Sequence, residues 1–255
     1  MQIFGIDLWR IILCIFLIII VVNRANIVAI YAKGIYAKGN YKKALKVYNI
    51  ADKIGNMNTN NKTFYGYALL RAGEVEKGQI ILRSLLPYTK VGSAARYQLK
   101  NLLALASWKS GYLDDAIEEL EEVVSANYKN TVIYQNLGIL YNLKGDFGKA
   151  LKFNQEAYEY NGDDNIILDN LADSYAKSGD LQKAKELYEE LLAREPQPHF
   201  PEAYYGYGKV LIELGEKEKG IEMIEKSLTK TFAFFSIKTK EEVEAMLEEY
   251  KKEIL

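Results

Sequence analysis

Cysteine and histidine, which build many catalytic and metal centres, are scarce in this sequence. Its 255 residues include one cysteine, Cys14, and one histidine, His199. A single cysteine cannot form a disulfide or a thiolate metal site within one chain, and no cysteine lies near His199 to complete a zinc set. We therefore interpret His199 as a loop residue and expect neither a metal site nor a cofactor.

Motifs for catalysis are missing as well. The sequence has no glycine-rich phosphate loop, nucleophile elbow or metal-binding pair of helical residues. Acidic pairs such as Asp114 and Asp115 are present, but their surroundings predict an exposed helical face on which the charges are solvated. We expect no catalytic residues and no enzymatic activity, and we expect no nucleic-acid partner.

Long apolar runs are absent except near the N-terminus. Every residue from Ile11 to Val22 is apolar, and only Asp7 and Arg10 interrupt the longer stretch from Ile3 to Val22. Roughly 17 to 25 such residues suffice to span a bilayer, and Arg10 can extend its charged end toward the interface. The sequence predicts that residues 1–24 form a membrane anchor that crosses the bilayer through Ile3 to Val22.

A cleaved signal peptide is the alternative interpretation of this segment. It lacks a convincing cleavage site of small residues, and cleavage near Ala25 or Ala29 would damage the first of the repeats described below. No proline or glycine lies between Ile11 and Lys33. We therefore predict that the membrane helix continues without a break into the first repeat.

Charge is distributed unevenly along the chain. The first 110 residues contain 16 basic and 4 acidic residues, and the remainder contains 17 basic and 30 acidic residues. The positive charge that follows the apolar run favours a cytoplasmic location for the C-terminal side. The basic N-terminal half could contact anionic lipid, and a solvated basic helix face is the equal alternative. The basic residues close behind the apolar run are Arg24, Lys33, Lys38, Lys42, Lys43 and Lys46.

Glycine recurs at a nearly constant spacing along the rest of the chain. Gly39, Gly73, Gly111, Gly145, Gly179 and Gly215 lie 34, 38, 34, 34 and 36 residues apart. A period of 34 residues with short insertions indicates a structural repeat. If each glycine is the fifteenth position, six repeats cover residues 25–234: 25–58, 59–92, 97–130, 131–164, 165–198 and 201–234.

Two other positions of the repeat contain only alanine or glycine. Such residues let the two antiparallel helices of a hairpin pack at the short end of the range of about 8 to 10 Å. The eighth position holds Ala32, Gly66, Ala104, Gly138, Ala172 and Gly208. The twentieth position holds Ala44, Gly78, Ala116, Ala150, Ala184 and Gly220.

These patterns predict an all-α fold of helical hairpins. Each recurring glycine marks a helix end, because glycine adopts the left-handed conformation found there without steric cost. Six hairpins follow, and Thr239 with Glu242 forms a capping box that opens a further helix to about Lys252. We expect residues 235–255 to form a terminal helix that covers the last apolar face.

The pattern resembles the tetratricopeptide repeat family, and the fourth and fifth units match it best. The resemblance implies a right-handed α-solenoid, although the closing proline appears only at Pro196 and Asn154 replaces an aromatic residue. Signature positions are occupied by Tyr134, Leu137, Gly138, Tyr141, Ala150 and Ala157 in the fourth unit, and by Leu168, Leu171, Ala172, Tyr175, Ala184, Tyr188 and Pro196 in the fifth.

The resemblance also implies a concave groove that binds a peptide or protein. In peptide-binding members, the amide at the position of Asn136 and Asn170 holds the ligand backbone. The residue set that grips the carboxylate of chaperone tails is absent, so we expect an extended peptide or a helix as the ligand. The expected groove residues are Asn101, Trp108, Gln135, Asn136, Asn142, Asp169, Asn170, Asp173, Lys177, Tyr205 and Lys209.

Two functions remain open from the sequence. The first is a membrane-anchored scaffold that recruits or assembles partner proteins at the cytoplasmic face of the membrane. The alternative is an extracytoplasmic, anchored or secreted assembly factor for envelope or secreted proteins. The abundance of Lys, Ile, Asn and Tyr favours a bacterial source.

Overall fold

The computed structural model describes the backbone of residues 2–3 and 6–252 and the side chains from Trp9 to Lys252. The chain divides into two compact units, Met1–Val91 and Gly92–Leu255, which we call unit 1 and unit 2. Among the described residues the only strands are β1 (Gln2–Ile3) and β2 (Ile6–Asp7), and all other elements are helical.

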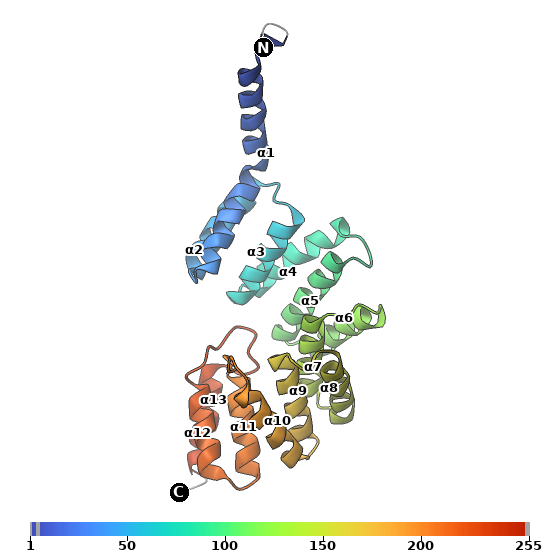
Figure 1. Ribbon diagram of the computed structural model, residues 1–255, viewed down its shortest axis with the longest axis vertical. Helices are drawn as coiled ribbons and strands as arrows, with labels where there is room; N and C mark the ends of the chain where they lie inside the picture. Colours follow the sequence, from blue (N-terminus) through green and yellow to red (C-terminus); the bar gives the residue numbers. More distant parts are fainter. Residues whose placement is uncertain (1, 4–5, 253–255) are drawn as a thin grey trace. The chain divides into compact units, whose positions relative to one another are not determined.

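The first helix of unit 1 is long and only partly packed. Helix α1 (Leu8–Ala37) contains 30 residues without a break, which confirms the prediction of one continuous helix. Figure 1 shows its N-terminal part projecting beyond its hairpin partner, helix α2 (Tyr41–Ile54). The helix begins later than the predicted span, because Ile3 and Ile6 pair as short antiparallel strands before it.

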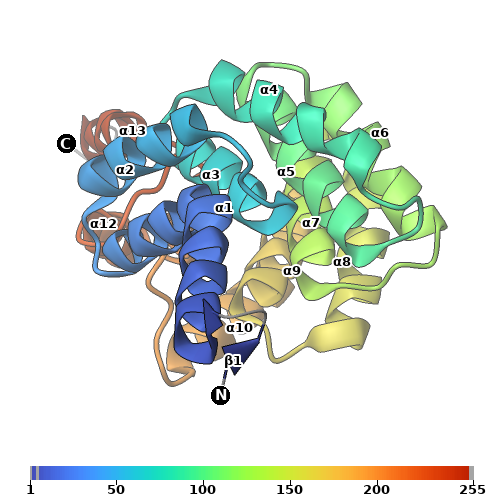
Figure 2. The same ribbon diagram turned by 90° about the horizontal axis from the view of Figure 1, so that it is seen from above.

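The remainder of α1 is the first helix of a packed hairpin. Ala25, Ala29 and Ala32 are buried against α2, together with Tyr48 and Ala51. In Figure 2 the C-terminal part of α1 lies alongside α2. Helix α3 (Thr59–Arg71), helix α4 (Val75–Leu85) and the short 3₁₀ turn η1 (Leu86–Tyr88) complete unit 1.

Unit 2 contains four hairpins and a terminal helix. Its first helix begins at Ala94, three residues before the repeat position Tyr97, because Ser93 caps it by accepting a hydrogen bond from the amide of Arg96. Its helices are α5 (Ala94–Lys109), α6 (Leu113–Ser125), α7 (Thr131–Lys144), α8 (Phe147–Asn161), α9 (Asn165–Lys177), α10 (Leu181–Ala193), α11 (Glu202–Glu213), α12 (Lys217–Ser227) and α13 (Lys240–Lys252).

The predicted helix ends and close approaches are both confirmed. All six recurring glycines have positive φ angles, between 79° and 90°, where other residues would be strained. At the eighth and twentieth positions the backbones nearly touch: a Cβ atom added to Gly208 would lie 2.6 Å from the carbonyl oxygen of Gly220. The spacing of small residues therefore sets the distance between the paired helices.

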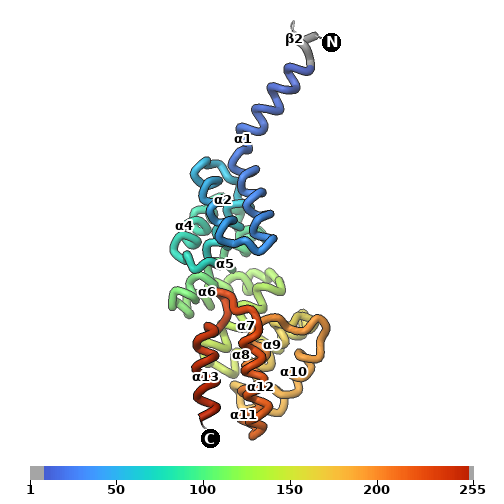
Figure 3. The backbone as a smooth tube through the Cα atoms, turned by 90° about the vertical axis from the view of Figure 1, so that its left-hand side faces the viewer, coloured from blue at the N-terminus to red at the C-terminus, as the bar shows by residue number. Residues whose placement is uncertain are grey.

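Helix α13 closes the end of unit 2. The hydroxyl of Thr239 accepts a hydrogen bond from the amide of Glu242, and the carboxylate of Glu242 accepts one from the amide of Thr239, as a capping box requires. Val243 and Leu247 are buried against Ile224 and Tyr205. Figure 3 shows α13 beside α12, where it covers the apolar face that the last hairpin would otherwise expose.

Candidate peptide-binding surface

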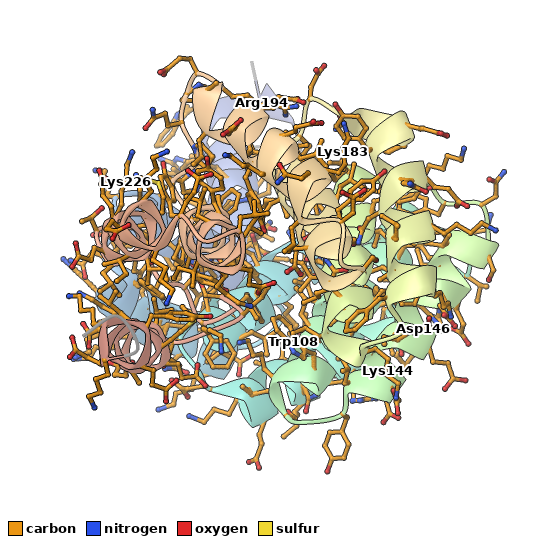
Figure 4. All side chains as sticks on the ribbon, turned by 90° about the horizontal axis from the view of Figure 1, so that it is seen from below. Trp108, Lys144, Asp146, Lys183, Arg194 and Lys226 are labelled. Atoms are coloured by element: carbon orange, nitrogen blue, oxygen red, sulfur yellow. The ribbon has the colours of Figure 1, made fainter. Side chains whose placement is uncertain are left out.

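All of the expected groove residues lie in unit 2, on the first helix of each hairpin. Asn101 and Trp108 lie on α5, and Lys209 lies with Tyr205 on α11. In Figure 4 Trp108 lies toward the middle of the helices of unit 2, whereas Lys226 lies at their outer edge. Helix α7 carries Gln135, Asn136 and Asn142, and helix α9 carries Asp169, Asn170, Asp173 and Lys177.

The asparagines of this surface connect one repeat to the next. Nδ2 of Asn136 donates to Oδ1 of Asn101 at 2.8 Å, which joins α7 to α5. Nδ2 of Asn170 donates to the carbonyl oxygen of Gln135 at 2.9 Å, and Nδ2 of Asn142 donates to that of Asn170 at 2.9 Å. These bonds hold the register between successive first helices.

Burial separates the two asparagines expected to hold a ligand. Asn170 is 3% exposed, and its amide donor is already used by the backbone of Gln135. Asn136 is only partly buried. Both amides bond within the protein, Asn136 to Asn101 and Asn170 to Gln135, and Asn136 is the more accessible of the two.

A buried polar network lies between α7, α8 and α9. The hydroxyl of Ser174 donates to Oδ1 of Asn142 at 2.6 Å, and Nδ2 of Asn154 donates to that hydroxyl at 2.8 Å. Nζ of Lys177 donates to the carbonyl oxygen of Asn142 at 3.1 Å. The sequence identified Asn154 only as a departure from the family pattern. The pairing of Asn154 with Gly138, which leaves room for the amide, could have indicated a buried polar network.

Carboxylates of α9 and α11 share a region of low exposure. Asp169 is 6% exposed, and its Oδ1 has no hydrogen-bond partner among the described residues. Burial raises the pKa of Asp169 well above its usual range, and the negative charges of Glu202 and Asp173 add to this, while Lys177 opposes it. Burial also raises the pKa of Tyr205, whose hydroxyl has no partner in the described part of the chain.

A segment from the far end of unit 2 also contacts this surface. Nζ of Lys109 donates to the carbonyl oxygen of Ser236 at 2.7 Å. The amide of Ile237 donates to Oε1 of Glu202 at 2.9 Å. Burial lowers the pKa of Lys109, and the nearby Glu202 opposes this shift. Sequence reasoning did not predict these contacts.

Two surface hollows lie elsewhere. One of about 620 Å³ is lined by Glu190, Arg194 and Pro196 beyond the end of α10, and one of about 410 Å³ lies between α1 and α2 beside Tyr31 and Lys43. None of the expected groove residues lines either hollow.

The helical hairpins, their glycine ends and their small contact positions define a helical-repeat protein. The family model of the tetratricopeptide repeat matches residues 101–165 and 170–231. The chain belongs to the tetratricopeptide repeat family.

Solved structures share this fold. A tetratricopeptide repeat protein from Parabacteroides merdae aligns with a TM-score of 0.73 and 16% identity, over 90% of this chain and 85% of its own. A thermophilic relative from Thermus thermophilus aligns with a TM-score of 0.59 and 21% identity, over 74% and 99%. The type IV pilus biogenesis factor PilW aligns with a TM-score of 0.65 and 16% identity, over 79% and 91%. No functionally curated protein matches the sequence significantly.

Proposed function

We propose that this protein is a membrane-anchored scaffold, whose repeats bind a partner protein and hold it at the cytoplasmic face of the membrane. Helix α1 is the anchor, and the first helices of unit 2 supply the binding surface. Tetratricopeptide repeats are protein-interaction modules, and the fold therefore supports a role in binding.

The exposure of α1 carries the proposal. Residues 12–24 are all exposed, although residues 12–22 are apolar without exception. Among the described residues, one helix, Trp9–Ala37, has the length and apolar composition to cross a membrane. An apolar helical surface of this length requires a nonaqueous environment, because contact with water would cost about 25 cal/mol for each Å².

The charges that follow α1 support the cytoplasmic side. Lys38 is exposed in the turn after α1, Lys42 and Lys43 are exposed in the first turn of α2, and Arg24 is exposed two residues after the apolar run. Basic residues close to a span are retained on the cytoplasmic side during insertion.

The partly buried groove residues support binding at unit 2. Trp108, Asn136 and Lys209 each keep part of their surface accessible. Together they offer an aromatic ring, an amide and a positive charge, a combination suited to an extended peptide with acceptor groups. The partner is a protein or peptide of this kind.

Topology is the first test. Cys14 is replaced by serine and Lys252, which is exposed on α13, is replaced by cysteine. Intact cells are then treated with a membrane-impermeant maleimide. Protection until the cells are lysed is expected, because the repeats face the cytoplasm.

Labelling of intact cells would contradict the cytoplasmic orientation. It would favour the second candidate, an extracytoplasmic assembly factor, which is motivated by the position of the apolar helix at the N-terminus. Recovery of the unlabelled protein in the soluble fraction would refute anchoring altogether.

Partner binding is tested separately with Asn136→Ala. The protein is crosslinked in cells and purified, and the recovered partner is quantified. The expected result is a severalfold loss of partner with unchanged helicity. Gln182→Ala, at an exposed position on α10, is the matched control and should have no effect. Equal recovery with both variants would exclude the predicted surface.

A further inference from the structure

The connection between α12 and α13 is unusually long and apolar. It spans residues 228–239 and includes Phe232, Phe234, Phe235 and Ile237. Connections between neighbouring helices commonly have about 2 to 8 residues, and longer ones often have a function. Residues 232–238 are all at least partly buried. The connection is therefore packed against the protein.

The connection is held through its main chain. The carbonyl oxygen of Ser236 accepts a hydrogen bond from Nζ of Lys109 on α5. The amide of the next residue, Ile237, donates to the carboxylate of Glu202 on α11. Both bonds involve a charged side chain and are therefore stronger than bonds between neutral groups. Two oppositely charged residues thus bind adjacent donor and acceptor groups of one peptide segment.

Aromatic rings surround the positive charge that makes the first of these contacts. Nζ of Lys109 lies 4.3 Å from the centre of the Trp108 ring and 5.8 Å from that of Phe234. Such distances allow cation–π attraction to both rings. Phe234 therefore adds a side-chain contact to the two main-chain bonds, two residues before the carbonyl that Lys109 binds.

These contacts have the character of peptide recognition. The bonds to the main chain of Ser236 and Ile237 depend little on side-chain identity, and the ring contact selects an aromatic residue at one place. The residues that make them, Trp108, Lys109 and Glu202, come from the first helices of the third and sixth repeats. This is the surface on which the proposed partner binds.

We propose that residues 232–237 are an internal ligand, which occupies the binding surface between α5 and α11 in the free protein. The partner presents a segment with an aromatic residue two positions before the carbonyl bound by Lys109, in the turn that residues 233–236 form here, and it displaces residues 232–237. This inference rests on the proposed function and specifies how the same site is regulated.

The tether between α12 and α13 determines how strongly the partner must bind. A short tether presents its segment at an effective concentration in the millimolar range. A free peptide of the same sequence therefore competes poorly with the tethered copy. A partner that displaces the tethered segment binds more tightly than the free peptide, or is itself concentrated at the membrane.

The test uses the full chain in detergent micelles and a fluorescein-labelled peptide of residues 231–238. Wild type is compared with an opened variant, Phe234→Ser with Ile237→Pro, which removes the aromatic contact and the donated amide. Fluorescence anisotropy is expected to give a Kd of about 0.1 mM or lower for the opened variant and, because a tethered copy at a millimolar effective concentration competes, binding at least about tenfold weaker for wild type. Equal binding to both, or binding to neither, overturns the proposal.

Controls separate recognition from folding. In the opened variant, Lys109→Ala should weaken peptide binding by about tenfold, since a charge-assisted bond is lost. Lys217→Ala, at an exposed position on α12, should leave it unchanged. Equal effects of the two lysine variants would refute the assigned contact.

Hydrogen exchange on the otherwise wild-type chain provides a test that does not need the opened variant to fold. Lys109→Ala should accelerate exchange of the amides of residues 232–238, and Lys217→Ala should not. Unchanged exchange after Lys109→Ala would show that the bond from Lys109 does not hold the segment, which refutes the proposal. These readouts require neither the membrane nor a cellular partner, so they can fail while the scaffold function stands.

Discussion

Alanine at Gly138 would test the contact between α7 and α8 most directly. A Cβ atom at this position would lie 2.1 Å from Oδ1 of Asn154 and 3.0 Å from Nδ2 of Asn170. Asn154 is fully buried, and its amide donates to the hydroxyl of Ser174 at 2.8 Å. Asn154 must therefore move, and its bond to Ser174 must be distorted or lost.

The expected magnitude combines three effects on the free energy of unfolding. Replacing glycine by alanine inside a helix stabilises it by about 1 kcal/mol. Overpacking costs about 1 to 3 kcal/mol, and loss of the hydrogen bond of Asn154 costs about 1 kcal/mol. Gly138→Ala should therefore destabilise unit 2 by about 2 kcal/mol.

A second substitution tests whether Asn154 is the cause of the destabilisation. In an Asn154→Ala background the closest obstruction is absent and only Nδ2 of Asn170 remains, at 3.0 Å, so Gly138→Ala should be neutral or stabilising by up to about 1 kcal/mol. The two substitutions are then coupled by about 2 to 3 kcal/mol, whereas independent sites are additive within about 0.5 kcal/mol. Each single variant and the double variant are required.

The assay is urea unfolding of the full chain in detergent, followed by circular dichroism and by hydrogen exchange of α7 and α8. Gly148→Ala is the control, because the nearest atom to an added Cβ there is 3.9 Å away and the position is exposed. It should not be coupled to Asn154→Ala. Equal destabilisation by Gly138→Ala in both backgrounds would exclude a steric conflict with Asn154 as the cause.

Three further predictions concern other parts of the molecule. Because burial and neighbouring carboxylates raise the pKa of Asp169, the folded state retains a proton there that the unfolded chain releases above about pH 4. The stability that this group contributes therefore falls as pH rises from about 4 to the raised pKa of Asp169. Asp169→Asn should increase the melting temperature more at pH 7 than at pH 5. An equal change at both pH values would contradict this. Thr239→Ala should destabilise α13 by about 1 kcal/mol and accelerate its amide exchange, while Thr229→Ala serves as the control outside the capping box. Ile18→Lys, which places a charge at a site that is 61% exposed on α1, should cost about 3 kcal/mol on insertion and reduce the membrane fraction, whereas Ile50→Lys on α2 should not.

The helical framework could be predicted because its signals are local and periodic. The glycine that ends each first helix needs a positive φ angle, and the small residues at positions such as Ala104 and Ala116 are needed wherever two helices approach closely. These constraints recur in every unit, so six copies reinforce one another. The capping box at Thr239 is equally local.

The binding surface was less predictable because the repeat spacing does not determine whether a polar side chain turns toward the neighbouring repeat or away from it. The sequence is equally compatible with an Asn170 side chain that faces a ligand and one that faces the neighbouring repeat, and only the positions of α7 and α9 show that it binds the carbonyl of Gln135. Lys109 and Ser236 are 127 residues apart, and no spacing rule connects them. The short pairing of Ile3 with Ile6 was likewise hidden within an apolar sequence that also suited a helix.

If α1 crosses the bilayer, its continuity also determines how deeply the first repeat lies in the membrane. At 1.5 Å per residue, the stretch from Trp9 to Arg24 rises only about 23 Å, less than the hydrocarbon thickness of about 30 Å. Ala25, the next residue, is already buried in the hairpin with α2. On the opposite side of α1, Ile27 and Ile30 remain exposed, and they would then lie at the level of the lipid headgroups. The first hairpin would then be partly immersed at the membrane interface. It would rotate and tilt together with the membrane-spanning part of α1 as one rigid body, whereas a flexible linker would let it move independently.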